Sequence, residues 1–212
     1  MNSTAHSGLD LFYPIVPDAS WIARIVPLGV RCVQLRIKDA SGDDIARQIE
    51  AGLAMTRAYG CQLIVNDYWR EAIDAGADYI HLGQEDLAAA DLAAIKRSGM
   101  KLGVSTHSTE ELATALAVEP DYVALGPVYE TKLKAMPWAP QGVDRVREWK
   151  AAIGPLPLVA IGGLTLERAD LVADAGANSL AVITDFMTAQ DPHERIENWV
   201  RWAREKRSAA AP

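Results

Sequence analysis

The chain alternates short apolar segments rich in β-branched residues with longer alanine-rich segments in which apolar residues recur every three or four positions. The first pattern is typical of buried parallel strands, and the second is typical of amphipathic helices that cover them. Strands are predicted at residues 11–16, 32–37, 63–66, 79–82, 102–105, 122–125, 158–161 and 179–183. Helices are predicted at residues 18–28, 43–59, 69–75, 87–98, 109–118, 143–153, 166–175 and 192–207.

Repeated β-then-α units predict an α/β fold, a single (β/α)8 TIM barrel over residues 1–212. Residues 1–8 and 208–212 are expected to be frayed. The alternative is an open doubly wound sheet, which places a glycine-rich loop after its first strand; here that strand leads into Val16-Pro17-Asp18. In a barrel, functional residues gather at the carboxyl ends of the strands.

Composition and charge narrow the class of protein. A chain of 212 residues that is 50% hydrophobic fits one domain with a substantial core. The net charge of −7 argues against a nucleic-acid partner, because the chain has no basic stripe to contact phosphates. No apolar run is as long as a membrane span and the first residues lack a signal-peptide core, so a cytoplasmic protein without a membrane partner is expected. The sequence does not determine whether the chain forms a homo-oligomer.

Polar and charged side chains follow one face of the second predicted strand. From Val33 to Asp39, apolar and polar residues alternate, so Gln34, Arg36 and Lys38 share a face. Burying such charges without a partner costs roughly several kcal/mol each. The pattern therefore predicts an anionic ligand such as a phosphate or pyrophosphate. The alternative is the solvated face of an edge strand.

Two aspartates follow neighbouring predicted strands. Asp67 comes directly after the third strand, and Asp86 comes shortly after the fourth. Because adjacent barrel strands end at the same rim, this pair predicts an Mg2+ site whose remaining ligands come from substrate phosphates. Mn2+ is not distinguished from Mg2+. Taken singly, each aspartate is also typical of a helix N-cap.

A second anion site is predicted after the seventh and eighth strands. The segment Ile161-Gly162-Gly163-Leu164-Thr165 opens a helix, and backbone N–H groups at such a turn bind oxyanions. The long connection at residues 126–142 predicts a lid or binding loop, with a plain surface loop as the alternative. Both predicted phosphate sites lie at the carboxyl ends of the strands, the end of the barrel that we call the mouth. Two phosphate sites there indicate a reaction that joins two phosphorylated molecules.

From Tyr13 to Thr184 the chain resembles the thiamine phosphate synthase family. The resemblance rests on six motifs: Gln34-Leu35-Arg36-Ile37-Lys38-Asp39, Asn66-Asp67-Tyr68-Trp69, His81-Leu82-Gly83-Gln84-Glu85-Asp86-Leu87, Gly103-Val104-Ser105-Thr106-His107, Gly126-Pro127 through Thr131 and Lys134, and Ile161-Gly162-Gly163. It implies a transferase that joins a hydroxymethylpyrimidine diphosphate to a thiazole phosphate, giving thiamine phosphate and pyrophosphate. The implied mechanism is dissociative and passes through a pyrimidine-stabilised carbocation, so no general base is required.

The resemblance also implies roles for individual residues. The diphosphate is expected to be held by Gln34, Arg36, Lys38, Asn66, Ser105 and Lys134. Of these, the catalytic set is Arg36, Lys38, Ser105 and Lys134. Mg2+ is expected on Asp67 and Asp86, and His81 is expected to border the pyrimidine. The thiazole phosphate is expected at Thr131, Gly163, Ile183 and Thr184.

Two other functions remain as alternatives. A thiazole tautomerase has a pattern similar to Gly-His-Val-Phe-Glu-Thr in the lid; this chain has proline at the histidine position, Pro127, and keeps both aspartates that the tautomerase pattern lacks. A non-catalytic barrel that binds thiamine precursors is expected to lose the cationic and metal-binding residues, which are present here. Leu133 and Glu130 depart from the family's lid pattern and are expected to alter thiazole phosphate binding. His107 is interpreted as a residue that supports the site from behind or caps a helix, rather than as a catalyst.

Overall fold

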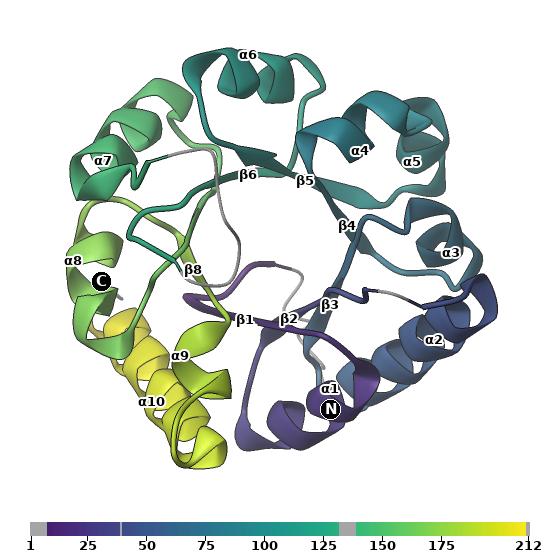
Figure 1. Cartoon of the computed structure of the whole chain (residues 1–212), viewed down its shortest axis with the longest axis horizontal. Helices are drawn as coiled ribbons and strands as arrows, with labels where there is room; N and C mark the ends of the chain where they lie inside the picture. The colour runs from purple at the N-terminus through teal and green to yellow at the C-terminus, as the bar shows by residue number, and fades with distance from the viewer. Residues whose placement is uncertain (1–7, 39, 132–138, 211–212) are drawn as a thin grey trace.

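Eight parallel strands close into a ring that is covered on the outside by helices (Figure 1). The computed structural model describes residues 8–38, 40–131 and 139–210. The strands are β1 (Phe12–Val16), β2 (Cys32–Leu35), β3 (Gln62–Asn66), β4 (Tyr79–Leu82), β5 (Lys101–Thr106), β6 (Tyr122–Leu125), β7 (Leu158–Ile161) and β8 (Ser179–Val182). β1 pairs with both β2 and β8. The predicted barrel is therefore confirmed, and the open sheet is excluded.

The helices follow the predicted order, with three differences. They are α1 (Ala19–Ile25), η1 (Val26–Leu28), α2 (Gly42–Ala58), α3 (Trp69–Asp74), α4 (Gln84–Ala89), α5 (Leu92–Ser98), α6 (Thr109–Ala117), α7 (Gly142–Ile153), η2 (Leu166–Arg168), α8 (Ala169–Asp174), α9 (Thr184–Met187) and α10 (Pro192–Ala210). The helix expected at 87–98 is two helices, because Asp91 accepts a hydrogen bond from the backbone of Ala94 and starts α5 anew. α9 was not expected, and α10 ends at Ala210 rather than at residue 207. None of the helices in the described part of the chain is both long and apolar enough to cross a bilayer.

The period-two pattern of the strands produces two apolar layers. One layer, between strands and helices, contains most of the buried aliphatic side chains, Val33 and Leu35 of β2 among them. The other fills the ring itself and consists of Tyr13, Ile15, Cys32, Ile64, Tyr79, Tyr122, Ala124, Val159 and Ala181. Because Cys32 points inward, Gln34 two residues later also points inward, toward the carboxyl ends of the strands.

A glycine on β5 makes room for a large side chain inside the ring. Gly103 is the register partner of Tyr122 on β6. A Cβ atom on Gly103 would lie 2.0 Å from Cζ of Tyr122, so the tyrosine ring occupies the space where a side chain would otherwise project. The ring is fully buried, and it stacks on His81 with ring centroids 5.5 Å apart. Gly103 therefore fixes where the Tyr122 hydroxyl reaches within the barrel.

We expect Gly103→Ala to destabilise the fold by about 2 kcal/mol or more, because the added methyl group overpacks a filled interior. In a Tyr122→Leu background the same substitution should cost much less, because the clashing ring is gone. The measurement is a double-mutant cycle of the free energy of unfolding in urea. Equal costs in the two backgrounds would contradict this packing role.

Candidate functional site

Four polar side chains from neighbouring strands converge at one end of the ring. They are Gln34 on β2, Asn66 at the end of β3, His81 on β4 and Ser105 on β5. Asn66 and His81 are direct register partners. Gln34, Asn66 and His81 are 3%, 5% and 7% exposed, so their polar groups are held inside the barrel rather than in bulk solvent. The structure thus brings together three residues that the sequence predicted as ligands of the diphosphate and His81, which it predicted to border the pyrimidine.

A continuous set of hydrogen bonds links this cluster through two tyrosines. Nε2 of Gln34 donates to the Tyr13 hydroxyl at 2.9 Å, and the Tyr13 and Tyr122 hydroxyls are 3.1 Å apart. The Tyr122 hydroxyl lies 2.7 Å from Nδ1 of His81, and Nε2 of His81 lies 2.8 Å from Oγ of Ser105. In the described part of the chain, no buried side-chain nitrogen or oxygen lacks a hydrogen-bond partner.

His81 is neutral at pH 7. Burial is the main cause that lowers its pKa to about 4, and the nearby Arg36 guanidinium lowers it further. A neutral imidazole has one N–H donor and one acceptor nitrogen. If the nitrogen that faces Tyr122 accepts a hydrogen bond, the nitrogen that faces Ser105 therefore donates one, and the reverse also holds.

Asp67 and Asp86 lie next to each other at the carboxyl ends of β3 and β4. Their carboxyl groups share a hydrogen bond, although one follows β3 and the other lies in the first turn of α4. Burial, then the Asp86 charge and the shared hydrogen bond, raise the pKa of Asp67 to about 6; Arg36 and Asn66 oppose the rise. Paired carboxylates that repel each other once ionised are a suitable donor set for a hard divalent cation.

The capping alternative for these aspartates is wrong. The N-cap of α3 is Tyr68 and that of α4 is Gly83, and neither helix has a side-chain cap. Asp67 has a φ of 67°, a left-handed conformation that is uncommon outside glycine and concentrates at functional sites. Among the described residues no group of three or more His, Cys, Asp or Glu side chains is placed to hold a metal.

The two predicted cations of the second strand differ in placement. β2 ends at Leu35, two residues earlier than predicted, so Arg36 and Lys38 lie beyond its last ladder position. The backbone of Arg36 still donates to the carbonyl of Val16 at 2.8 Å, and its half-buried side chain acts on the pKa of Asp67. Lys38 is exposed at the rim. Arg36 is therefore part of the charged cluster, and Lys38 stands outside it.

A second cluster forms where the loop after β7 meets the segment after β6. Gly163 has a φ of 62°, and a Cβ there would lie 2.5 Å from the carbonyl oxygen of Glu130. Tyr129 donates its backbone N–H to Gly162 at 3.0 Å. The guanidinium of Arg168 donates to the Gly163 carbonyl and lies 4.2 Å from the centroid of the Tyr129 ring. The glycine turn thus holds the first residues of the long connection against the mouth.

The remaining predicted residues border this second cluster or fall outside the described chain. Ile183 is half-buried between β8 and α9, and Thr184 is the first residue of α9. Thr131 is half-buried and is the last described residue before the gap at 132–138. Lys134, like Leu133, lies outside the described residues, so its predicted role stays a prediction.

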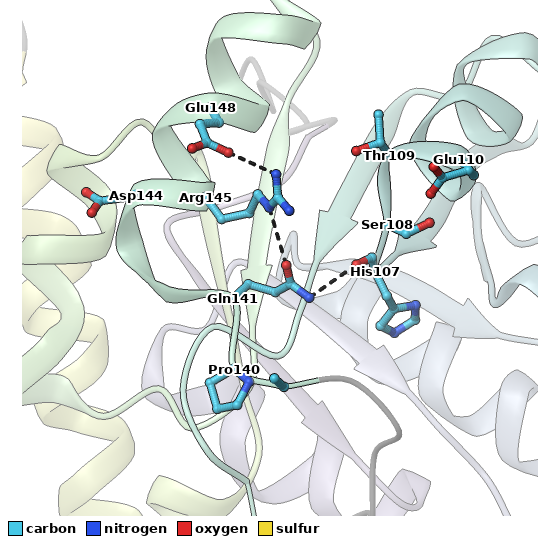
Figure 2. A pocket seen from close by; sticks show the side chains of 10 residues that line it. His107, Ser108, Thr109, Glu110, Pro140, Gln141, Asp144, Arg145 and Glu148 are labelled. Carbon is cyan, nitrogen blue, oxygen red and sulfur yellow. Dashed lines mark hydrogen bonds and ion pairs between the residues drawn. The ribbon is translucent and has the colours of Figure 1, made fainter.

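At the N-terminal ends of α6 and α7, residues of both helices and of the loops before them line an open hollow of about 620 Å3 (Figure 2). Gln141 donates to the carbonyl of His107 at 3.1 Å and accepts from Arg145. His107 donates its backbone N–H to Glu111, and its Nδ1 lies 2.8 Å from the same carboxylate. Oγ of Ser108 accepts a hydrogen bond from the backbone N–H of Glu111 and is the N-cap of α6. The cap is thus Ser108, and His107, directly before it, contacts Glu111 without being the N-cap itself.

Tyr13 and Tyr122 were missed by the sequence analysis as members of the site. Their strands were predicted correctly, but a tyrosine in a buried strand is ordinarily interpreted as part of the hydrophobic core. The available signal is that both sit at inward positions and that Gly103, in the predicted strand before Tyr122, lacks a side chain.

Comparisons with known proteins give a consistent result. A family model described as "Thiamine monophosphate synthase" matches residues 13–186. The thiamine-phosphate synthase of Rhizobium etli is 59% identical over 192 residues, which are 91% of this chain and 94% of that protein. That of Neisseria meningitidis serogroup A is 48% identical over 186 residues, which are 88% and 91% of the two chains. The solved structure of a thiamine phosphate pyrophosphorylase from Pyrococcus furiosus superposes with a TM-score of 0.81 at 26% identity, covering 93% and 96%.

We expect Asp86→Asn to stabilise the metal-free protein at pH 7. The folded-state pKa of Asp67, about 6, lies above its ordinary value of 3.8, so the stability that its proton supplies is full below about pH 4 and is lost as the pH rises through 6. Burial is the largest cause of the raised pKa, and replacing Asp86 removes the part of the loss that its charge causes. The pair is partly exposed, so the gain should be about 1 kcal/mol, or roughly 2–4 °C in Tm.

The measurement is Tm in EDTA at pH 7 and near pH 4.5, with Glu85→Gln as the matched control. Glu85 lies in the same first turn of α4 and is exposed. Only Asp86→Asn should gain stability, and only at pH 7. A gain of equal size at both pH values, or in both variants, would show that the carboxylates do not repel each other.

Proposed function

Because the chain belongs to the thiamine monophosphate synthase family, we propose that the mouth of its barrel takes a pyrimidine diphosphate and a thiazole phosphate and joins them with release of pyrophosphate. The chain is an enzyme of thiamine biosynthesis with thiamine-phosphate synthase activity. The proposal concerns which residues hold each substrate and how the reaction proceeds. The observation that carries it is the carboxylate pair beside Arg36, next to the buried polar ends of β3, β4 and β5.

The diphosphate is proposed to lie over the ends of β2 to β5. Arg36 offers a guanidinium that can bind two phosphate oxygens at once, and Asn66 and Ser105 offer neutral donors. Lys38 at the rim and Lys134, which is assigned from the family resemblance alone, would add positive charge. Gln34 supplies an amide at the inner end of the pocket.

Asp67 and Asp86 are proposed to hold Mg2+. Two carboxylates are what Mg2+ commonly takes from a protein when substrate phosphates complete its coordination. Once bound, the ion would neutralise part of the charge on the diphosphate. The raised pKa of Asp67 fits this role, because the carboxyl pair is destabilised without a cation.

The reaction is proposed to begin with loss of pyrophosphate from the pyrimidine methylene carbon, which leaves a carbocation stabilised by the pyrimidine ring. The C–O electron pair departs with the diphosphate oxygen, and the cationic side chains and hydroxyl donors stabilise that developing charge. The thiazole nitrogen then supplies the electron pair of the new C–N bond. His81, neutral and buried, is suited to border the ring rather than to transfer a proton.

The thiazole phosphate is proposed to lie at the second cluster. Backbone N–H groups at Gly163 and around Ile183 and Thr184 would hold a monophosphate that does not react, with Thr131 beside it. A thiazole tautomerase remains disfavoured, because its pattern lacks the aspartate pair that the structure brings together here.

Asp67→Ala should lower turnover by about 100-fold or more at saturating Mg2+, because one metal ligand is lost where charge develops. Its Tm should change by only a few degrees, because Asp67 lies outside the apolar core, and the relief of repulsion with Asp86 opposes the strain of alanine at a φ of 67°. The measurement is pyrophosphate release from the two substrates, with Glu85→Gln as control. Turnover within a few-fold of the wild type would rule out Asp67 as a metal ligand.

Gly163→Ala should raise the KM for the thiazole phosphate about tenfold and leave the KM for the pyrimidine diphosphate little changed, because a Cβ there displaces Glu130 and Tyr129 from the turn. Gly60→Ala is the matched control. Gly60 has a similar φ of 64°, and nothing lies within 4 Å of its Cβ position. Both variants carry the same backbone strain, so equal KM effects would place the thiazole phosphate elsewhere.

A further inference from the structure

The hydrogen-bonded set from Gln34 to Ser105 has only one polarity that leaves no buried tyrosine hydroxyl proton unpaired. Nε2 of Gln34 can only donate, so the Tyr13 oxygen accepts from it. Within the described chain, the Tyr13 hydroxyl proton then has one acceptor in reach, the Tyr122 oxygen at 3.1 Å. If Tyr122 donated to Tyr13 instead, a buried hydroxyl proton would be left unpaired, which is costly.

The same reasoning fixes the imidazole. With its oxygen accepting from Tyr13, Tyr122 donates its own proton to Nδ1 of His81, 2.7 Å away. Nδ1 is then an acceptor, so the single ring proton of neutral His81 is on Nε2 and is donated to Ser105 at 2.8 Å. The Ser105 oxygen accepts that bond, which leaves its hydroxyl proton available to the mouth.

We propose that Tyr13 and Tyr122 are positioning residues that hold His81 in its Nε2–H tautomer and thereby keep the Ser105 hydroxyl a hydrogen-bond donor to the departing diphosphate. The inference rests on the proposed function, because it needs an anion next to Ser105. With the opposite polarity, Ser105 would donate to His81 and present only lone pairs to an anion. The two tyrosine hydroxyls thus determine, from within the barrel, whether Ser105 attracts the leaving group.

Burial supports the assignment of both tyrosine hydroxyls as neutral groups that are held in place. Tyr13 and Tyr122 are at most 1% exposed, and burial raises the pKa of each hydroxyl well above its usual range. Neither therefore ionises near neutral pH. A barrel interior is ordinarily filled by branched aliphatic side chains, which carry no polar atoms to satisfy. Two buried hydroxyls in line with an imidazole indicate a purpose other than packing.

The test is the tautomer of His81, read from 15N chemical shifts and long-range 1H–15N couplings in protein labelled on histidine. We expect the Nε2–H tautomer in the wild type, with and without Mg2+ and inorganic pyrophosphate. In Tyr122→Phe we expect a substantial Nδ1–H population. We expect kcat for pyrophosphate release to fall about tenfold, as for the loss of other orienting partners, with little change in the KM for the thiazole phosphate.

Tyr79→Phe is the matched control. Tyr79 is also a buried inward-facing tyrosine, its ring centroid is 5.7 Å from that of Tyr122, and its hydroxyl has no hydrogen bond within the described residues. It should keep the wild-type tautomer and kcat. Tyr13→Phe interrupts the set one bond earlier and should shift the tautomer in the same direction as Tyr122→Phe, so the test does not depend on one variant folding.

An Nδ1–H tautomer in the wild type overturns the proposal, and so does an unchanged tautomer in both Tyr122→Phe and Tyr13→Phe, whatever their rates. Failure of the proposed diphosphate site is detected separately by Ser105→Ala. If that variant binds pyrophosphate with Mg2+ as tightly as the wild type does, the diphosphate does not contact Ser105. The tautomer result would still report whether the tyrosines orient His81.

Discussion

Closure of eight parallel strands into a ring is the constraint on which the site depends. In a closed ring every second side chain must point inward, and all strands end at the same rim. Gln34, Asn66, His81 and Ser105 are far apart in the sequence, but each lies at or near the last inward position of its strand. The alternation that gives each strand a buried face therefore also assembles the polar mouth.

The mouth is built at a cost that a ligand can offset. Asp67 adopts a left-handed backbone, and its carboxyl lies against that of Asp86 with a raised pKa. Two ionised carboxylates in contact repel each other, and buried polar side chains must be fully paired. A divalent cation and a polyanionic substrate relieve the repulsion and use the charge of Arg36. This combination explains why the cluster suits a diphosphate better than a neutral ligand.

Most of the fold could be predicted from local pattern, because strand and helix periods differ and eight repeats leave few topologies. The inward direction of the Gln34 side chain could also be predicted, because side chains alternate along a strand. The break at Asp91 could not be predicted, because it depends on a side-chain cap. The early end of β2 could not be predicted either, because it depends on the register of the strand ladder. The role of Tyr122 could not be predicted either, because it depends on a ring crossing from β6 over Gly103 to His81.

The most direct test of the central claim is a crystal structure with Mn2+ and inorganic pyrophosphate, in which anomalous scattering locates the metal. We expect one Mn2+ between the carboxylates of Asp67 and Asp86, bridged to pyrophosphate oxygens that also contact Arg36 and Ser105. Metal and pyrophosphate bound elsewhere, with the two carboxylates still sharing a proton, would contradict the claim.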